Sequence, residues 1–254
     1  VSFPATLLGS GLPFRLVDTI KGFNWLTFEG GKFSTSASHG IFTDAALALL
    51  PADTWRWWLA ANAPETADSD FTVTRFVNGV NKDLADVFGN LVNRCLTFAV
   101  GRFDGVVPEA GELGPLEHQL AHSLDVHLTR LRRHHESLAL RKAAEEVRAI
   151  WRLSNTYLAE TAPWSAIKDD TPRAATIVNT GINLVHVSAL AAWPFMPSSA
   201  EKVLCSLGEA ADPVPWPQDG KHALSAIPGG RRIAVPPLLF PKIAVDDLRA
   251  SHAS

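Results

Sequence analysis

The segment TVTRFVNGVNKDLADVFGNLVNRCLTF, residues 72–98, decides the fold. Its apolar side chains recur at steps of three and four residues, from Val73 through Leu84 to Phe98. That spacing places them in one stripe along a helix. A long helix with a single apolar face must bury that face against other helices, so we predict a helical bundle.

The neighbouring sequence shows the same helical pattern. Asp169 or Asp170 suits the capping position of one of the predicted helices, and Pro172 suits its first turn. Two short helices should be ended by Pro51 and Pro64. The predicted helices span residues 44–50, 53–62, 113–133, 138–158, 170–193 and 198–207.

Both ends of the chain differ from this pattern. Residues 1–42 predict a short helix at Pro4, strand-like runs at LVDTIKGF and NWLTFEGG, and the loop GGKFSTSASHG. Such a piece is too small to close a parallel sheet. It therefore packs on the bundle or ends a larger sheet, and a first residue other than Met favours the larger sheet. After Gly208, prolines predict an irregular, extended tail.

Composition sets broad limits. The 254 residues are 46% hydrophobic and 19% charged, which is typical of a globular protein and excludes disorder. No apolar run approaches the roughly 18–20 residues of a membrane span, and the first residues do not form a signal peptide. Two cysteines, Cys95 and Cys205, indicate a reducing cytoplasm. The net charge of −3 excludes binding of nucleic acid by overall charge alone, although a local basic stripe stays possible.

The loop Lys32-Phe33-Ser34-Thr35-Ser36 follows two glycines. A lysine ammonium, hydroxyl groups and loop N–H groups suit the binding of phosphate. By itself the pattern is weak evidence, and a solvated turn is the better interpretation until other motifs are considered.

Two further sets of residues suit contact with bases. Asn90 and Arg94 are four positions apart, so they are neighbours on the helix surface beside the buried stripe. An amide and a guanidinium are suited to base edges. Pro163-Trp164 lies at the end of a helix, where a tryptophan could stack on a base or belong to the core. For Asn90 and Arg94, the alternative is a polar helix face that contacts only solvent.

These motifs together resemble the C-terminal half of methionyl-tRNA synthetases, which are class I enzymes. KFSTS resembles the KMSKS signature, and VNKDLADVFGNLVNR at 80–94 resembles the family's anticodon-reading segment. FPATLLGSG at 3–11, the stretch 50–71 and IPGGRRIAVPPLLFPKI at 227–243 also fit. Tyr157 and Trp164 fit the family's tyrosine followed by "aPW".

The resemblance implies a mainly α fold that follows the end of a Rossmann-type catalytic domain. Residues 1–42 would carry the end of that domain with its KMSKS-like loop, 43–71 the stem-contact helices, 72–208 the anticodon-binding bundle, and 209–254 a tail that packs back on the body. The implied reaction is ATP-dependent attachment of methionine to its tRNA, with Mg²⁺ accompanying ATP in the complete enzyme. Lys32 would stabilise the pyrophosphate, while Asn90, Arg94, Pro163 and Trp164 would form the CAU anticodon site.

Two departures from the family matter. Thr35 stands where the signature has its second lysine, so charge stabilisation there should be weaker. No HIGH-like motif occurs in these residues, so the chain alone should not activate an amino acid. The catalytic half is expected to be either a separate or a missing part. The alternatives are a standalone, catalytically inert tRNA-binding protein and a scaffold protein derived from the family.

The other polar clusters have simpler interpretations. A run of cations on two predicted helices could face solvent or contact tRNA; it comprises Arg130, Arg132, Arg133, His134, His135, Arg141, Lys142, Arg148 and Arg152. His118 and His122 flank Gln119 where a zinc protease would have Glu, so we expect no metal site. The acids of Asp68–Asp70 predict a loop and a helix cap.

Overall fold

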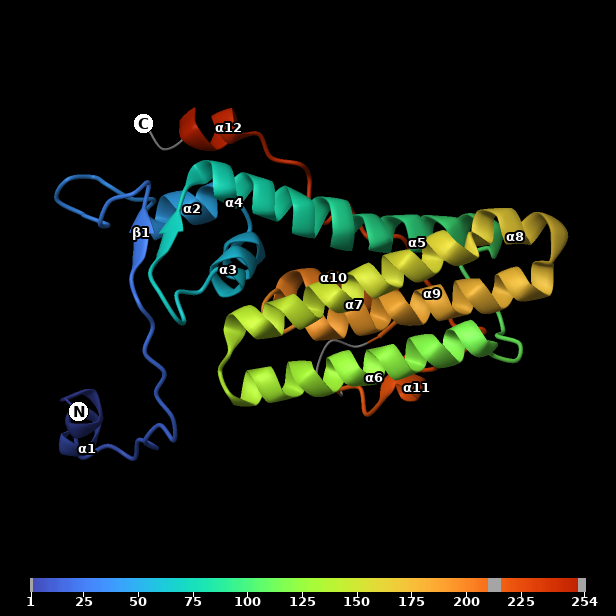
Figure 1. Cartoon of the computed structure of the whole chain (residues 1–254), viewed down its shortest axis with the longest axis horizontal. Coiled ribbons are helices and arrows are strands. Elements are labelled where there is room, and N and C mark those ends of the chain that lie inside the picture. Colours follow the sequence, from blue (N-terminus) through green and yellow to red (C-terminus); the bar gives the residue numbers. More distant parts are fainter. Residues whose placement is uncertain (1, 210–215, 251–254) are drawn as a thin grey trace.

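The computed structural model describes residues 2–209 and 216–250, which form an elongated helical bundle (Figure 1). One continuous rod lies along the top edge of this view. Three further long helices and one shorter helix lie beneath it. The rod comprises α4 (Val73–Val80), η1 (Asn81–Gly89) and α5 (Asn90–Arg102); the others are α6 (Pro115–Glu136), α7 (Leu140–Thr161), α9 (Thr171–Ala192) and α10 (Pro197–Ser206). The mainly α fold predicted from the apolar stripe is therefore confirmed.

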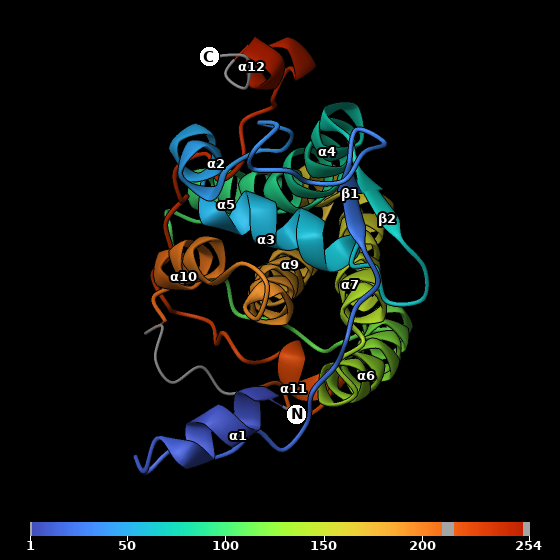
Figure 2. The ribbon, with the colours of Figure 1, turned by 90° about the vertical axis from the view of Figure 1, so that its left-hand side faces the viewer.

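Helix α9 forms the centre of the bundle. It packs against α5, α7, α8 (Pro163–Asp169) and α10, and the end-on view in Figure 2 shows it with α10 on one side and α7 on the other. By length and composition α9 could cross a membrane, so the expectation that no segment approaches such a span was wrong. However, 94% of its most apolar window is buried inside the protein. Its apolar character therefore follows from its place in the core.

The long rod is not a regular α-helix throughout, as its periodicity predicted. Residues 81–89 form a π-helical segment, in which each turn holds one extra residue. A side chain on Gly89 would bring its Cβ within 2.9 Å of the Leu84 carbonyl oxygen. The Val87 carbonyl accepts a hydrogen bond of 3.2 Å from the Asn155 side chain of α7. Glycine and this neighbouring amide thus accommodate the wider turn.

Helix α3 (Ala52–Ala61), which follows α2 (Thr43–Leu49), buries three tryptophans. Trp55 stacks on Phe76 of α4 with ring centroids 4.4 Å apart. Trp57 lies 4.6 Å from Trp151 of α7, on the other side of the helix. Because α3 is wedged between α4 and α7, more than one face of it is apolar.

The N-terminal region differs from its prediction in two places. Strand β1 (Leu26–Phe28) pairs in parallel with β2 (Ser69–Phe71), where a loop was expected. The acids at 68–70 were also expected to cap the following helix. The Asp70 carboxylate instead accepts hydrogen bonds from Thr27 and Gly30, and Thr72 caps α4. The run at 16–23 was wrongly predicted as a strand. In the described part of the chain, β2 pairs with 26–28, and 16–23 has no strand partner.

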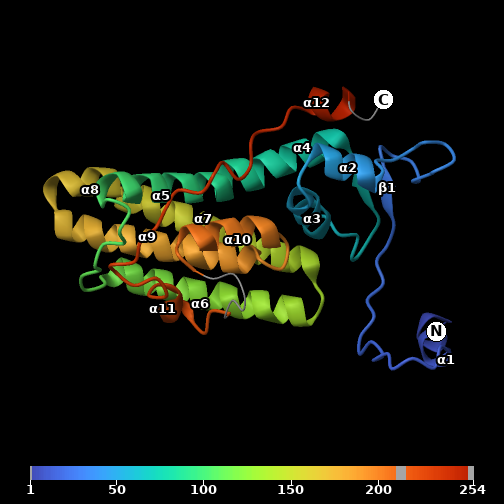
Figure 3. The same ribbon diagram turned by 180° about the vertical axis from the view of Figure 1, so that it is seen from behind.

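Helix α1 (Ser2–Gly9) forms where Pro4 predicted it and stands apart from the bundle, joined to β1 by an extended segment (Figures 1 and 3).

The C-terminal segment returns along the back of the rod, as Figure 3 shows. It contains the short helices α11 (Gly220–Ala223) and α12 (Val245–Ala250), which the irregular pattern did not predict. The Asn81 side chain bonds both the N–H and the carbonyl of Ile243, at 2.9 and 2.8 Å. Phe240 is buried near Phe88, with ring centroids 6.3 Å apart. These contacts fasten the segment to the π-helical part of the rod.

The π turn makes a prediction about Gly89. Replacing a helical glycine with alanine usually stabilises a helix by about 0.5–1 kcal/mol. We expect Gly89→Ala to lower the free energy of unfolding by about 1 kcal/mol or more instead, because the added methyl group meets the Leu84 carbonyl. Urea unfolding measures the difference.

Gly101 of α5 is the matched control, because a Cβ there meets no atom within 4 Å. Gly101→Ala should be neutral or stabilising. Equal effects of the two substitutions would contradict a steric role for Gly89.

Candidate nucleic-acid interface

Arg94 and Trp164 meet at the end of the bundle distant from the strands. The Arg94 guanidinium lies over the Trp164 ring, 4.8 Å from its centroid. Trp164 is 36% exposed and Arg94 is exposed. A cation over an indole ring is a favourable contact. The sequence-predicted pair is thus brought together as a flat, cationic and aromatic surface that water can reach.

The surrounding residues complete this surface. Phe98, one turn beyond Arg94, meets the Trp164 ring edge-on at 6.4 Å. Asn90 is half-buried one turn before Arg94, on the same helix. Pro163 is buried, so it shapes the turn that presents Trp164 and leaves its own ring inaccessible.

Trp164 is the second residue of a short helix that the sequence prediction missed, α8 (Pro163–Asp169). Helix α7 ends because Ala162 adopts a left-handed conformation with φ of 39°, which is costly for a non-glycine residue. At the other end of α8, the Asp170 side chain accepts the Arg173 N–H at 2.9 Å and caps α9. The cap prediction is therefore confirmed for Asp170.

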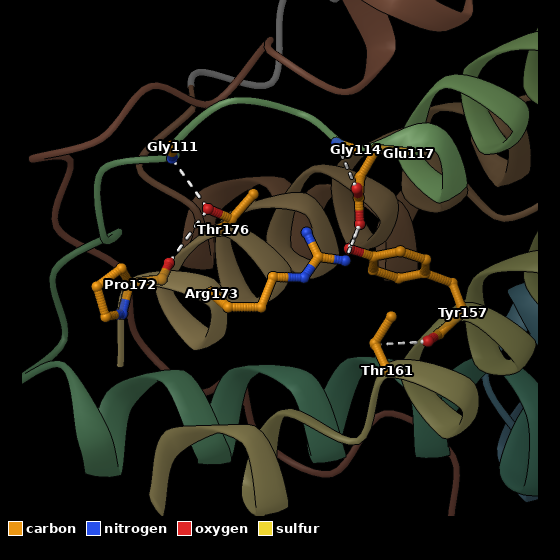
Figure 4. A network of polar contacts seen from close by, with 8 residues as sticks. All are labelled: Gly111, Gly114, Glu117, Tyr157, Thr161, Pro172, Arg173 and Thr176. Atoms are coloured by element: carbon orange, nitrogen blue, oxygen red, sulfur yellow. Dashed lines mark hydrogen bonds and ion pairs between the residues drawn. The ribbon is translucent and has the colours of Figure 1, made fainter. Parts of the chain in front are cut away.

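A buried carboxylate holds both flanks of α8, as Figure 4 shows. The Glu117 side chain of α6 is fully buried. Its Oε1 accepts hydrogen bonds of 2.7 Å from the Tyr157 hydroxyl and from the Arg173 guanidinium. Its Oε2 accepts the Gly114 N–H at 2.9 Å. Tyr157 lies near the end of α7 and Arg173 at the start of α9, so one side chain fixes the two helices between which Trp164 is held.

The pKa values of this cluster show which charge state it stabilises. Burial alone would raise the pKa of Glu117, but the hydrogen bonds from Arg173, Tyr157 and Gly114 outweigh it, and the pKa is lowered. Burial raises the pKa of Tyr157, and its bond to Glu117 adds to that rise. The hydrogen bond to Glu117 raises the pKa of Arg173. The cluster is thus an ionised carboxylate, a guanidinium and a neutral phenol.

The KFSTS loop lies at the opposite end of the molecule (Figure 1). Ser34 and His39 exchange two backbone hydrogen bonds of 2.9 Å across it. His39 Nε2 donates to the Phe28 carbonyl at 2.7 Å, and the Phe33 ring lies 5.5 Å from the Phe28 ring. The loop is therefore fastened to β1 by its aromatic residues.

The polar groups of the loop are turned to solvent. Lys32, Thr35 and Ser36 are exposed, and Ser34 is half-buried with its hydroxyl 3.3 Å from that of Ser36. Within the described part of the chain Lys32 has no hydrogen-bond or ion-pair partner. An unpaired ammonium beside several hydroxyl and N–H donors is available to an anion.

The predicted basic stripe is not continuous. Arg130, Arg132 and Arg133 are exposed on α6. Arg148 instead turns into the bundle, where its Nε bonds Asp83 at 2.7 Å. His135 is half-buried beside Phe195.

Comparison with known proteins agrees with this arrangement. Residues 107–254 match the model for the anticodon binding domain of methionyl tRNA ligase, and residues 1–96 match that for class I tRNA synthetases (M). The chain belongs to the methionyl-tRNA synthetase family. The resemblance read from the motifs is thus confirmed.

Individual relatives show how much of a family member the chain represents. It is 49% identical to methionine–tRNA ligase of Caulobacter sp. strain K31, over 96% of this chain and 43% of that protein. It is 46% identical to the Jannaschia sp. ligase, over the whole chain and 44% of that protein. The solved Mycobacterium tuberculosis methionyl-tRNA synthetase in complex with methionyl-adenylate superposes with a TM-score of 0.80 at 29% identity, covering 95% of this chain and 47% of that one. The chain spans less than half the length of these relatives.

Sequence reasoning found Arg94, Pro163 and Trp164 of this methionyl-tRNA synthetase chain and named Tyr157 by resemblance, but it missed three residues that position them: Phe98, Glu117 and Arg173. Phe98 was counted only in the buried stripe. Glu117 follows Gly114-Pro115-Leu116, a pattern typical of a helix start, and nothing in that pattern shows that its carboxylate turns inward. Its partners, Tyr157 and Arg173, lie far along the chain, so only the fold brings them together.

Glu117→Gln should reduce stability in a pH-dependent way. We expect a loss of about 2–3 kcal/mol at pH 7, because Arg173 and Tyr157 lose an ionised partner. The folded pKa of Glu117 is lowered, so its stabilisation is complete above the unfolded value of about 4.3 and is lost as pH falls through the folded pKa. Denaturant unfolding at pH 7 and pH 3 should therefore show the difference narrowing in acid.

Glu160→Gln, at an exposed position of α7, is the control and should change stability little at either pH. A Glu117 effect that stays constant with pH would refute the ionic role of the cluster.

Proposed function

We propose that the protein to which this chain belongs attaches methionine to its tRNA with the consumption of ATP, and that this chain contributes the surface that reads the CAU anticodon. The observation that carries the proposal is the exposed stack of Arg94 on Trp164 at the tip of the bundle. The family match to an anticodon-binding domain supports it, since that match includes Trp164. The ligase relatives do not favour the alternative of an inert tRNA-binding or scaffold protein.

The roles follow from the chemistry of each side chain. Trp164 would stack on an anticodon base, a contact worth about 1–3 kcal/mol. Arg94 and Asn90 would bond base edges. In the free protein Arg94 lies over one face of the indole, so it is held close to the base that Trp164 receives. Pro163, being buried, would act by fixing the turn.

The KFSTS loop would serve the ATP site of the complete enzyme. Lys32 would stabilise negative charge on the pyrophosphate, aided by Ser34, Ser36 and the aromatic frame of Phe33. Thr35 can donate a hydrogen bond but carries no charge, so it would contribute less than a lysine. The ammonium and hydroxyl donors suit phosphate oxygens, and the Mg²⁺ that accompanies ATP would be bound with it in the complete enzyme.

The proposed division is 1–42 for the end of the catalytic domain, 43–71 for the stem-contact helices, 72–208 for the anticodon-binding bundle and 209–254 for the returning tail. The proposed partners are methionine, ATP and methionine tRNA, with the rest of the catalytic half in the same or another chain. The proposed location is the cytoplasm.

The anticodon surface is tested by substitution. Trp164→Ala and Arg94→Ala should each weaken binding of methionine tRNA about tenfold or more, because stacking and base contacts are lost. Electrophoretic mobility shift at fixed salt measures the affinity. The same tRNA with a changed anticodon is the control, and its weak binding should be little affected. If the unaltered chain binds both tRNAs equally, the anticodon proposal fails.

The nucleotide loop gives a second test. The 254-residue chain by itself should show no methionine-dependent exchange between ATP and pyrophosphate, since the resemblance assigns it only the KFSTS part of the ATP site. A full-length ligase from Caulobacter is the positive control. Exchange by this chain that disappears in Lys32→Ala would contradict the expectation.

A further inference from the structure

A groove of about 430 Å³ lies between α3, the first half of the long rod and α7. Figure 1 shows these three elements converging on the side of the bundle that faces the viewer. Four cations line the groove, with one carboxylate, that of Asp83, among the lining residues. We call it the basic groove; its cations are Arg75, Lys82, Arg148 and Arg152.

The carboxylate of the basic groove is already engaged. Asp83 accepts 2.7 Å and 3.1 Å hydrogen bonds from Arg148 Nε and Trp57 Nε1. The Arg148 guanidinium also lies 5.4 Å from the centroid of the Trp57 ring. Asp83 and Arg148 therefore neutralise one another and form part of the groove wall.

Two of the other three cations, Lys82 and Arg152, remain available. Arg75 donates to the backbone carbonyl of Asp70, whose carboxylate lies close enough to feel its charge and is itself held by Thr27 and Gly30. Lys82 and Arg152 are exposed, and neither has a partner among the residues that the structure describes.

Neighbouring acids do not neutralise Lys82 and Arg152. Asp86, one turn beyond Lys82, pairs instead with Lys242 at 2.8 Å. The basic groove thus carries an excess of positive charge in a polar recess, which suits an anion.

The position of the basic groove indicates which kind of anion would bind there. Lys82 and Arg94 stand twelve positions apart on one continuous rod, a separation of at most about 18 Å at the α-helical rise of about 1.5 Å per residue. In a regular α-helix residues twelve apart would point about 120° away from one another. The wider turns of the π-helical segment between them add residues without adding rotation, and so close most of this angle. The groove and the Arg94–Trp164 surface therefore face the same side of the rod.

We propose that the basic groove binds backbone phosphates of the tRNA whose anticodon is bound at Trp164. Phosphate contacts fix register while base contacts specify sequence, so the groove would set the position at which the anticodon reaches Arg94. This proposal rests on the proposed function and names a second part of the tRNA that the chain contacts. The sequence-predicted basic run contributes to it only through Arg148 and Arg152.

The test is the double variant Lys82→Gln/Arg152→Gln, with tRNA affinity measured from 50 to 200 mM salt. We expect affinity at low salt to fall about tenfold or more for methionine tRNA and by the same factor for the tRNA with a changed anticodon, because phosphates carry no sequence information. The dependence of log affinity on log salt should become shallower by about 0.7–0.9 for each charge removed. Trp164→Ala should instead affect only the cognate tRNA.

The charge-matched control is Arg132→Gln/Arg133→Gln, whose exposed arginines lie on α6 outside the groove. Equal losses in the two double variants would overturn the proposal, since general charge would then explain both. Unchanged affinity in the groove variant, with a loss in Trp164→Ala, would overturn the groove and leave the anticodon surface standing. If the unaltered chain binds no tRNA, both proposals fail.

Phosphate-ethylation interference gives an independent readout. Ethylation of particular phosphates should weaken binding to the unaltered chain and have no further effect on the groove variant. An identical interference pattern for both proteins would also overturn the proposal. Thermal unfolding of each variant shows whether the fold is retained, which the exposure of both side chains leads us to expect.

Discussion

The geometry of the end of the bundle that carries Trp164 depends on one buried carboxylate. An ionised Glu117 can be buried only if its charge is neutralised and its lone pairs are bonded. Arg173, Tyr157 and the Gly114 N–H meet this requirement from three different segments. The requirement therefore fixes where α7 ends and where α9 begins. The short helix that carries Trp164 is the connection between those two fixed points, so its position follows from the neutralisation of a side chain on α6.

The π-helical segment of the long rod determines the directions in which the cations on either side of it point. A surface that contacts a long, flexible polyanion at several points needs its contacts on one side of a stiff element. A regular helix would turn the cations near α3 away from Arg94, whereas the π-helical segment turns them back. The absence of a side chain at Gly89 and the amide of Asn155 at the Val87 carbonyl make that segment possible. The glycine at position 89 thus has a structural reason, which is the close approach of the Leu84 carbonyl five residues earlier.

The boundary between what sequence could and could not predict follows the range of the interactions involved. Apolar periodicity predicted the long helices because a stripe such as that of 72–98 depends only on near neighbours. It failed for β2, since the strand exists only through pairing with Leu26–Phe28, more than forty positions earlier. It also failed for 16–23, whose β-branched residues suit a strand but have none beside them in the described part of the chain. At the site, Arg94 and Trp164 came from motif and resemblance, while Glu117 came only from the fold.

Net charge is a weak guide to the partners of this chain, and the distribution of its cations explains why. The total of −3 includes acids that are used internally, such as Glu117 with Arg173 and Asp83 with Arg148. Once those pairs are set aside, the exposed side chains of Lys82, Arg94 and Arg152 have no ion-pair partner among the residues that the structure describes. The field that a ligand meets is then set by local excess, within about 10 Å at 0.1 M ionic strength. A mildly acidic protein can therefore present a surface suited to RNA, provided that its fold sequesters its carboxylates elsewhere.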